Sequence, residues 1–206
     1  MNSFDLTVSL VVMRLLAGII IATVQGVTLA AAAVLLGDKG PRHDGRLTLM
    51  PWGHIDLPGL GSIMLTGFGW GRAVAIDPDK LRSGRWGLVL AVLAGSAGLL
   101  LLGFLLPLLA SPLLRSLDFT AGVAAAAFVR VAARLCVWMA LFSLLPIPPL
   151  AGAHLLTAVG LLAPKQAGAY IGGLLVLASA AGLTQKLLTP AYNLIAPLLL
   201  GVDVAL

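Results

Sequence analysis

Long runs without a charged residue constrain the fold of this chain more than any other feature of its sequence. No Asp, Glu, Lys or Arg occurs between Arg14 and Asp38, and none occurs between Arg85 and Arg115. A helix of about 20 apolar residues crosses the hydrocarbon core of a bilayer, so each run is long enough to be a membrane span. With 60% hydrophobic and 10% charged residues, the chain is predicted to be a polytopic membrane protein.

The distribution of charges along the chain predicts a single all-α membrane domain, residues 1–206, with about four to five spans. The predicted intervals are 15–37 for span 1, 86–110 for span 2, 131–163 for a proline-broken span 3, 166–185 for span 4, and 187–202. The last interval contains Pro190 and Pro197. It is either a short fifth span or an interfacial helix.

The loop at residues 38–85 differs from the spans because seven Lys or Arg and five Asp gather in it. The positive-inside rule therefore predicts that this loop lies on the cytoplasmic side. Polar and apolar residues alternate at 46–49 and 72–76, which predicts two short strands of a β-hairpin. The Gly-rich apolar segment 57–70 is too short to span as a helix and predicts a re-entrant or surface-lying segment. The net charge of +5 is thus a topology signal, and no nucleic-acid partner is expected.

Two motifs and a weaker third match carry a family resemblance. The first motif is Gly37-Asp38 followed by Gly45-Arg46-Leu47-Thr48-Leu49, Pro51 and His54-Ile55-Asp56; the second is Leu144-Leu145-Pro146-Ile147-Pro148-Pro149-Leu150-Ala151-Gly152; the third opens at Gly69-Trp70. Through these residues the chain, from about Leu15 to Gly152, resembles the site-2 protease family of intramembrane zinc metallopeptidases, in its small bacterial branch. The resemblance implies a site-2-protease-like helical core in the bacterial cytoplasmic (inner) membrane.

The same resemblance implies that the zinc ligands and the catalytic residues are absent. Counted back from Gly37-Asp38, the family's His-Glu-x-x-His falls on Gln25, Gly26 and Leu29; its asparagine falls on Leu99, and its aspartate ligand on Ala151. The chain contains no glutamate at all, so no shift of the alignment can supply the general base that such an enzyme needs. We therefore predict a non-catalytic homologue, a pseudoprotease, without bound zinc.

An active intramembrane zinc metalloprotease with a displaced metal site is the alternative. The remaining candidate ligands, His43, His54, His154 and Cys136, show no helical ligand spacing. A site that combines His54 and His154 with Asp56 is the arrangement that this alternative would require.

The chain retains the motifs of the family fold but lacks its catalytic residues. This combination predicts a protein that binds the transmembrane segments of a partner. The chain would be a subunit, or an assembly or stabilising factor, of a hetero-oligomeric complex with other integral membrane proteins, with lipids as further partners. The candidate partner-binding residues are Arg72, Val74, Ile76, Arg130, Arg134 and Pro148.

Two features support this selection of residues. The family resemblance aligns segment 69–78 with an edge strand that helps to hold an extended substrate. Ala73 and Ala75 stand where that strand has two prolines, so this chain has two additional backbone N–H donors there. Arg130 and Arg134 stand four residues apart and share a helix face. Either span 3 begins near Arg134 and both side chains reach the headgroups, or they pair with a carboxylate of a partner protein.

Overall fold

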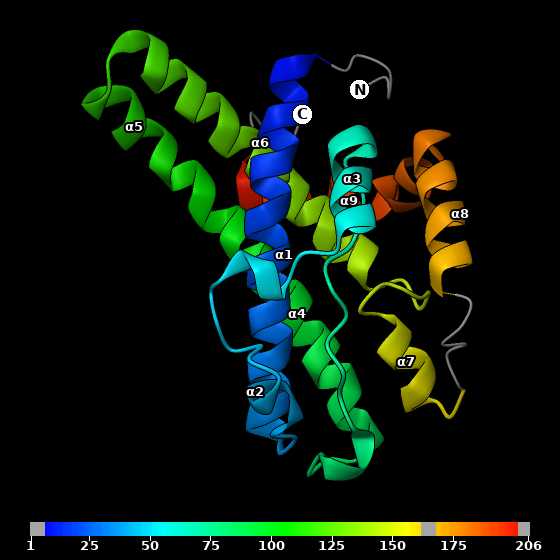
Figure 1. Ribbon diagram of the computed structural model, residues 1–206. Helices are drawn as coiled ribbons and strands as arrows, with labels where there is room; N and C mark the ends of the chain where they lie inside the picture. Colours follow the sequence, from blue (N-terminus) through cyan, green and yellow to red (C-terminus); the bar gives the residue numbers. More distant parts are fainter. Residues whose placement is uncertain (1–6, 162–167, 202–206) are drawn as a thin grey trace.

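The structure is a computed structural model that describes residues 7–161 and 168–201, and within these ranges the chain is all-helical (Figure 1). The helices are α1 (Val8–Leu36), α2 (Gly40–His43), α3 (Leu57–Thr66), α4 (Arg85–Leu105), α5 (Ala110–Ser116), α6 (Phe119–Ser143), α7 (Ala153–Ala158), α8 (Gly168–Ala180) and α9 (Leu183–Leu200). Short 3₁₀ turns lie at Pro51–Gly53, Pro78–Lys80 and Leu106–Leu109. The all-α prediction is confirmed.

Three helices are long and apolar enough to cross a membrane, so the chain is an integral membrane protein. They are α1, the 32-residue helix Arg85–Ser116 in which α4 continues through a 3₁₀ turn into α5, and the 25-residue α6. A fourth candidate is the pair Tyr170–Ala180 and Leu183–Leu200, which is bent by 71°. The described residues thus provide three spans, or up to four, where four to five were expected.

The third long helix begins earlier than the predicted interval 131–163. Asp118 caps its N-terminus by accepting a hydrogen bond from the Ala121 N–H (3.2 Å), so Arg130 and Arg134 lie well inside α6. The helix ends at Ser143, directly before the proline-rich loop. The predicted interval ends at 162–163, 166–167 and 202 lie outside the described residues.

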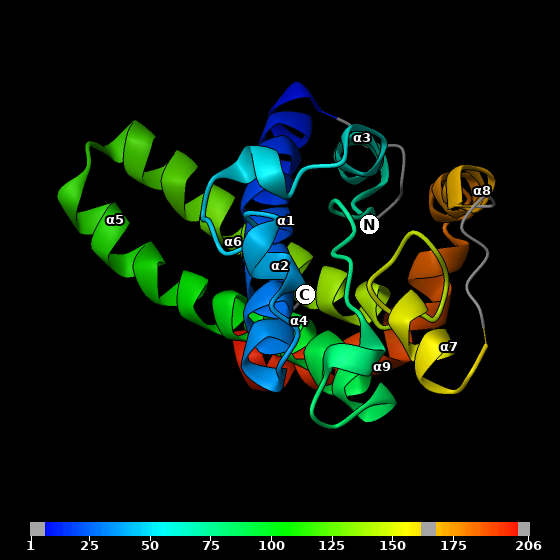
Figure 2. The ribbon, with the colours of Figure 1, turned by 60° about the horizontal axis from the view of Figure 1, so that its bottom comes forward.

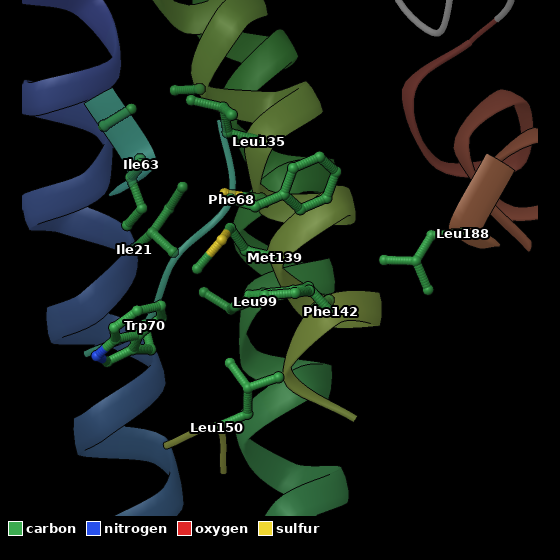
Figure 3. Packing of buried hydrophobic residues seen from close by; sticks show 14 of the residues in the cluster. Ile21, Ile63, Phe68, Trp70, Leu99, Leu135, Met139, Phe142, Leu150 and Leu188 are labelled. Atoms are coloured by element: carbon green, nitrogen blue, oxygen red, sulfur yellow. The ribbon is translucent and has the colours of Figure 1, made fainter. Parts of the chain in front are cut away.

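Small residues let α1, α4 and α6 approach each other closely. A Cβ at Gly98 of α4 would lie 2.6 Å from the Thr28 side chain, and one at Gly103 would lie 3.1 Å from Cβ of Cys136. Close backbone approach through such residues is the usual way in which membrane helices pack. The core between them is filled by large apolar side chains; Figure 3 shows Ile21, Ile63, Phe68, Leu99, Met139 and Phe142 among them.

The predicted β-hairpin is wrong, because neither 46–49 nor 72–76 forms a strand and none occurs among the described residues. A side chain takes the place of a strand ladder: the Arg46 guanidinium donates to the carbonyl oxygens of Gly53, Arg72 and Ala73. Among the described residues no backbone hydrogen bond joins 46–49 to 72–76; the Arg72 N–H donates instead to the His54 oxygen (2.7 Å). The Arg46 side chain therefore donates to carbonyl oxygens that would otherwise accept the backbone hydrogen bonds of a β-hairpin.

The segment between these parts runs along α1 and back, as a re-entrant segment does. Helix α3 packs beside the N-terminal half of α1 (Figure 1): a Cβ at Gly18 would lie 3.0 Å from Leu60, and Arg14 Nη1 donates to the Leu65 oxygen (3.1 Å). After Gly67, which ends α3 at φ 82°, the chain returns. Its Asp77 N–H donates to the Asp38 carboxylate (2.8 Å) beyond the other end of α1.

Candidate functional site

The predicted catalytic positions gather around one small cavity of about 40 Å³. Gln25, Gly26 and Leu29 line it from α1, and Ala151 lines it from the proline-rich loop. Leu99 does not line the cavity and is fully buried in the apolar core instead (Figure 3). The structure thus brings four of the five positions together.

His54 occupies the space beside Gly26 where a side chain at position 26 would begin. A Cβ built on Gly26 would lie 2.2 Å from His54 Nδ1. The imidazole is 1% exposed, and its Nε2–H donates to the Thr48 carbonyl oxygen (2.8 Å). Nδ1 is therefore the unprotonated nitrogen, and it has no hydrogen-bond partner among the described residues. An imidazole and a catalytic side chain at position 26 cannot share this space.

His154 lies on the other side of the cavity and holds the extended segment 71–76. Its Nε2–H donates to the Val74 carbonyl oxygen (3.0 Å), and Val74 is buried below it. His54 and His154, two of the candidate zinc ligands named from the sequence, thus each donate one N–H to a backbone carbonyl.

Two buried serines, Ser96 of α4 and Ser143 of α6, form a hydrogen-bonded pair. Ser143 Oγ donates to the Ala140 oxygen (2.9 Å) and accepts from Ser96 Oγ (3.1 Å). Both serines are buried. The hydrogen bond joins α4 to α6 at the edge of the cavity, so these polar positions have a packing role.

A zinc ion has no matching ligand set in the described part of the chain. No group of three or more His, Cys, Asp or Glu residues there could hold a metal, whereas catalytic zinc takes three protein ligands and a water. Asp56, which a displaced site would need, caps α3 at the Gly59 N–H (3.1 Å) and accepts from the Trp70 indole (2.6 Å). The residues present do not fit zinc.

The segment Gly71–Ile76 is extended and shows one free edge. Arg72 is tied to the protein through both its N–H and its oxygen, and Val74 through its oxygen. The N–H and C=O of one residue point to the same edge of an extended chain, and those of the next residue point to the opposite edge. Residue 75 therefore faces away, and the Ala75 N–H and C=O have no partner among the described residues. At residue 73 the oxygen accepts from Arg46, and only the N–H lacks a partner among the described residues.

A groove of about 420 Å³ opens beside this edge. Asp56, Trp70 and Ala73 form one wall, and Pro149 and Val176 form the other. Figures 1 and 2 show the extended segment running between α1 and the α7–α8 region. A Cβ on Gly172 would lie 3.1 Å from the Trp70 ring, and one on Gly173 would meet nothing within 4 Å. The groove therefore has room for apolar side chains next to an unpaired backbone edge.

The six predicted partner-binding residues fall into separate places. Arg72 and Val74 line the cavity, and Ile76 packs on the neighbouring apolar cluster around Leu29. Pro148 is half-buried in the loop beside the cavity, where Pro149 is the lining residue. Arg130 is exposed on α6, and Arg134 lines a different pocket near Arg14. Sequence reasoning gave no role to Arg46, although its place in the first motif was visible.

Folding stability is expected to fall as the pH drops below about 6.5. Burial lowers the pKa of His54 and of His154 from the ordinary value of 6.5, although each Nε2–H bond to a carbonyl opposes this. The unfolded chain therefore binds protons first, so the stability is fully present above 6.5 and is lost as the pH falls through the lowered folded pKa.

Thermal unfolding in detergent between about pH 7.5 and about pH 5.5, where ordinary carboxylates stay ionised, measures this dependence. His154→Gln should flatten the curve, whereas His43→Gln, at an exposed position, should leave it unchanged. A transition midpoint that does not move with pH would contradict the prediction.

Comparison with known proteins finds one relative whose description names an enzymatic activity. The chain is 34% identical over 128 residues to a protein described as "Putative zinc metalloprotease YwhC" of Bacillus subtilis (strain 168). The match covers 60% of this chain and 58% of the relative, a little over half of its length. No family model matches the chain, and no solved structure matches it. The chain is a membrane protein distantly related to one described as a zinc metalloprotease.

Proposed function

We propose that this chain is a non-catalytic relative of the site-2 proteases that holds a transmembrane segment of another integral membrane protein. The segment would unwind locally and add as a strand at Ala75, where both backbone groups lack a partner among the described residues. The chain would then act as a subunit or an assembly factor of a membrane complex. The similarity to a described zinc metalloprotease and the motif resemblance support the family, and the positive-inside rule supports a cytoplasmic loop 38–85 in a bacterial inner membrane.

The observation that carries the proposal is the backbone of Ala75, which is unpaired among the described residues and lies two residues from Ala73. Ala73 lines both the groove and the cavity. A backbone N–H and C=O are strong hydrogen-bonding groups, and those of Ala75 have no partner among the described residues. An extended peptide satisfies both at once, which is how strand addition gives affinity. Ala73 and Ala75 are exposed, so their small side chains leave room for a backbone to approach.

The groove supplies the second part of recognition. Side chains of an added strand alternate between its two faces, so every second one would point towards Trp70, Pro149 and Val176. The groove is lined mostly by apolar residues and glycines, which favours apolar side chains of a membrane segment. The proposal therefore commits to an apolar extended segment as the ligand.

Ala75→Pro is expected to weaken partner binding about tenfold, because it removes one N–H donor at the edge. Ala75→Val is the matched control, since it also adds apolar carbons but keeps the N–H. The measurement uses a photo-crosslinking amino acid at position 73 in the native membrane, with the crosslinked peptide identified by mass spectrometry. An equal yield from both variants would reject strand addition at this edge.

A crosslinker at Ala124, an exposed alanine of α6, serves as the positional control. Products from position 73 should map to a membrane span of another protein, and those from position 124 should not share that site. The description of the relative as a zinc metalloprotease makes an enzymatic activity the alternative to test. One zinc ion per purified chain, together with cleavage of a transmembrane peptide, would overturn the non-catalytic assignment.

A further inference from the structure

We propose that a second pocket, between α1, α6 and the bend of α8 and α9, binds the phosphate group of an anionic phospholipid. The pocket has a volume of about 100 Å³, and two guanidinium groups, of Arg14 and Arg134, line it. It is separate from the cavity at Gly26 and from the groove beside Ala75.

Arg14 is the residue on which the inference rests. Its side chain is 7% exposed in a helix that is long enough to span the membrane. One of its N–H groups donates to the Leu65 oxygen (3.1 Å), and the guanidinium group has five such donors in total. No other hydrogen bond of Arg14 to a described residue is present. A buried guanidinium with spare donors binds an anion strongly.

The walls of the pocket suit a phosphate group at the boundary of an apolar region. Gln185 lines the pocket, and its amide makes no hydrogen bond within residues 7–161 and 168–201. The Thr66 hydroxyl already donates to the Ser62 oxygen (2.9 Å), and Ser179 pairs with Thr184 (2.9 Å). Phe68 and Trp138 form an apolar side. No Asp of the described residues lines the pocket, and Arg14 has no carboxylate partner among the described residues. The pocket therefore combines a buried guanidinium group, which suits a phosphate, with apolar walls, which suit the rest of a lipid molecule.

The depth of Arg14 selects a lipid as the source of the phosphate. From Arg14 to the end of α1 at Leu36, a rise of about 1.5 Å per residue gives about 33 Å. This length is close to the thickness of the hydrocarbon core, about 30 Å. If the charged loop after Leu36 lies at one surface, Arg14 lies at the headgroup level of the other leaflet. Phospholipid phosphates are concentrated at this level.

Native mass spectrometry of the full chain in a neutral detergent tests the inference. Phosphatidylglycerol and phosphatidylcholine share the phosphate group but differ in net charge. We expect the chain to retain one phosphatidylglycerol about tenfold more than phosphatidylcholine. Arg14→Gln should abolish this preference. Arg130→Gln should keep it, because Arg130 is an exposed arginine of α6 outside the pocket. Equal retention of phosphatidylglycerol by both variants would overturn the proposal.

Two further arms keep the test decisive. Inorganic phosphate in millimolar excess should not displace the bound phosphatidylglycerol, and displacement would reject a lipid as the ligand. If Arg14→Gln does not give folded protein, Gln185→Leu takes its place. A loss of retention in that variant would support the site, and unchanged retention would overturn it. The site does not depend on partner binding at residues 73–75, because no residue is shared between the two.

Discussion

Gly26→Ala is expected to destabilise the folded chain by about 3 kcal/mol, at the upper end of overpacking effects. The new Cβ would lie 2.2 Å from His54 Nδ1, and the imidazole has little space to move because it is 1% exposed and bonded to the Thr48 oxygen. Either α1 shifts or the hydrogen bond breaks. Thermal unfolding in detergent, followed by the fraction of monomer that remains soluble, measures the loss.

Gly61→Ala is the matched control, because a Cβ at Gly61 meets nothing within 4 Å. It should be neutral or slightly stabilising, since alanine favours the helix. In a His54→Ala background the same Gly26→Ala change should cost less than about 1 kcal/mol, which would show the coupling of the two positions. If Gly26→Ala lowered the free energy of unfolding equally in the wild-type and His54→Ala backgrounds, the clash would not be with His54.

The same contact bears on attempts to restore catalysis. A glutamate at position 26 would need the space that His54 occupies, so Gly26→Glu is expected to destabilise the chain without creating a general base. Recovery of activity would require His54 to move and three metal ligands to be added. We therefore propose that the site differs from an enzyme in its packing as well as in its ligands.

Arg46→Met is expected to cost about 3–5 kcal/mol, because three carbonyl oxygens lose hydrogen bonds from a charged donor, and leaving a buried acceptor unsatisfied costs roughly 1–3 kcal/mol. The guanidinium of Arg46 donates to Gly53 and to the oxygens of Arg72 (2.5 Å) and Ala73 (2.6 Å). Removing it leaves three carbonyls without their donor. Arg46→Lys should recover only part of the loss, because an ammonium group lacks the planar fork that reaches several carbonyls.

Hydrogen exchange locates the effect of this substitution. Exchange of the Arg72 N–H, which is bonded to the His54 oxygen, should become faster in Arg46→Met, whereas Arg42→Gln, at an exposed position, should leave it unchanged. Partner crosslinking from position 73 should fall as well, because the edge would no longer be held in place. Wild-type exchange at residues 72–74 in Arg46→Met would contradict this role of Arg46.

The sequence predicted the long helices well because their signal is local. Charge-free apolar runs gave α1 and the helix from Arg85, and the motif spacing placed Gln25, Gly26, Leu29 and Ala151, which the structure gathers around one cavity. The start of α6 was predicted too late, because the charges of Arg130 and Arg134 outweighed the N-cap signal of Asp118.

The remaining features depend on contacts between distant parts of the chain. The alternation at 72–76 is real, since Val74 is buried while Ala73 and Ala75 are exposed. It predicted a hairpin because no local rule shows that an arginine 26 residues away will take the carbonyls of the strand. The packing of His54 on Gly26 likewise joins two segments whose proximity no periodicity reveals.

The course of α3 has a consequence for the biogenesis of the chain. With ten residues, α3 is too short for the insertion machinery to release it into the bilayer as a span. Helix α8, which packs on it, is synthesised about a hundred residues later. We therefore expect α3 to enter the membrane only after the later helices have been inserted. The groove between α3 and α8 would then form late, when the whole chain has left the ribosome.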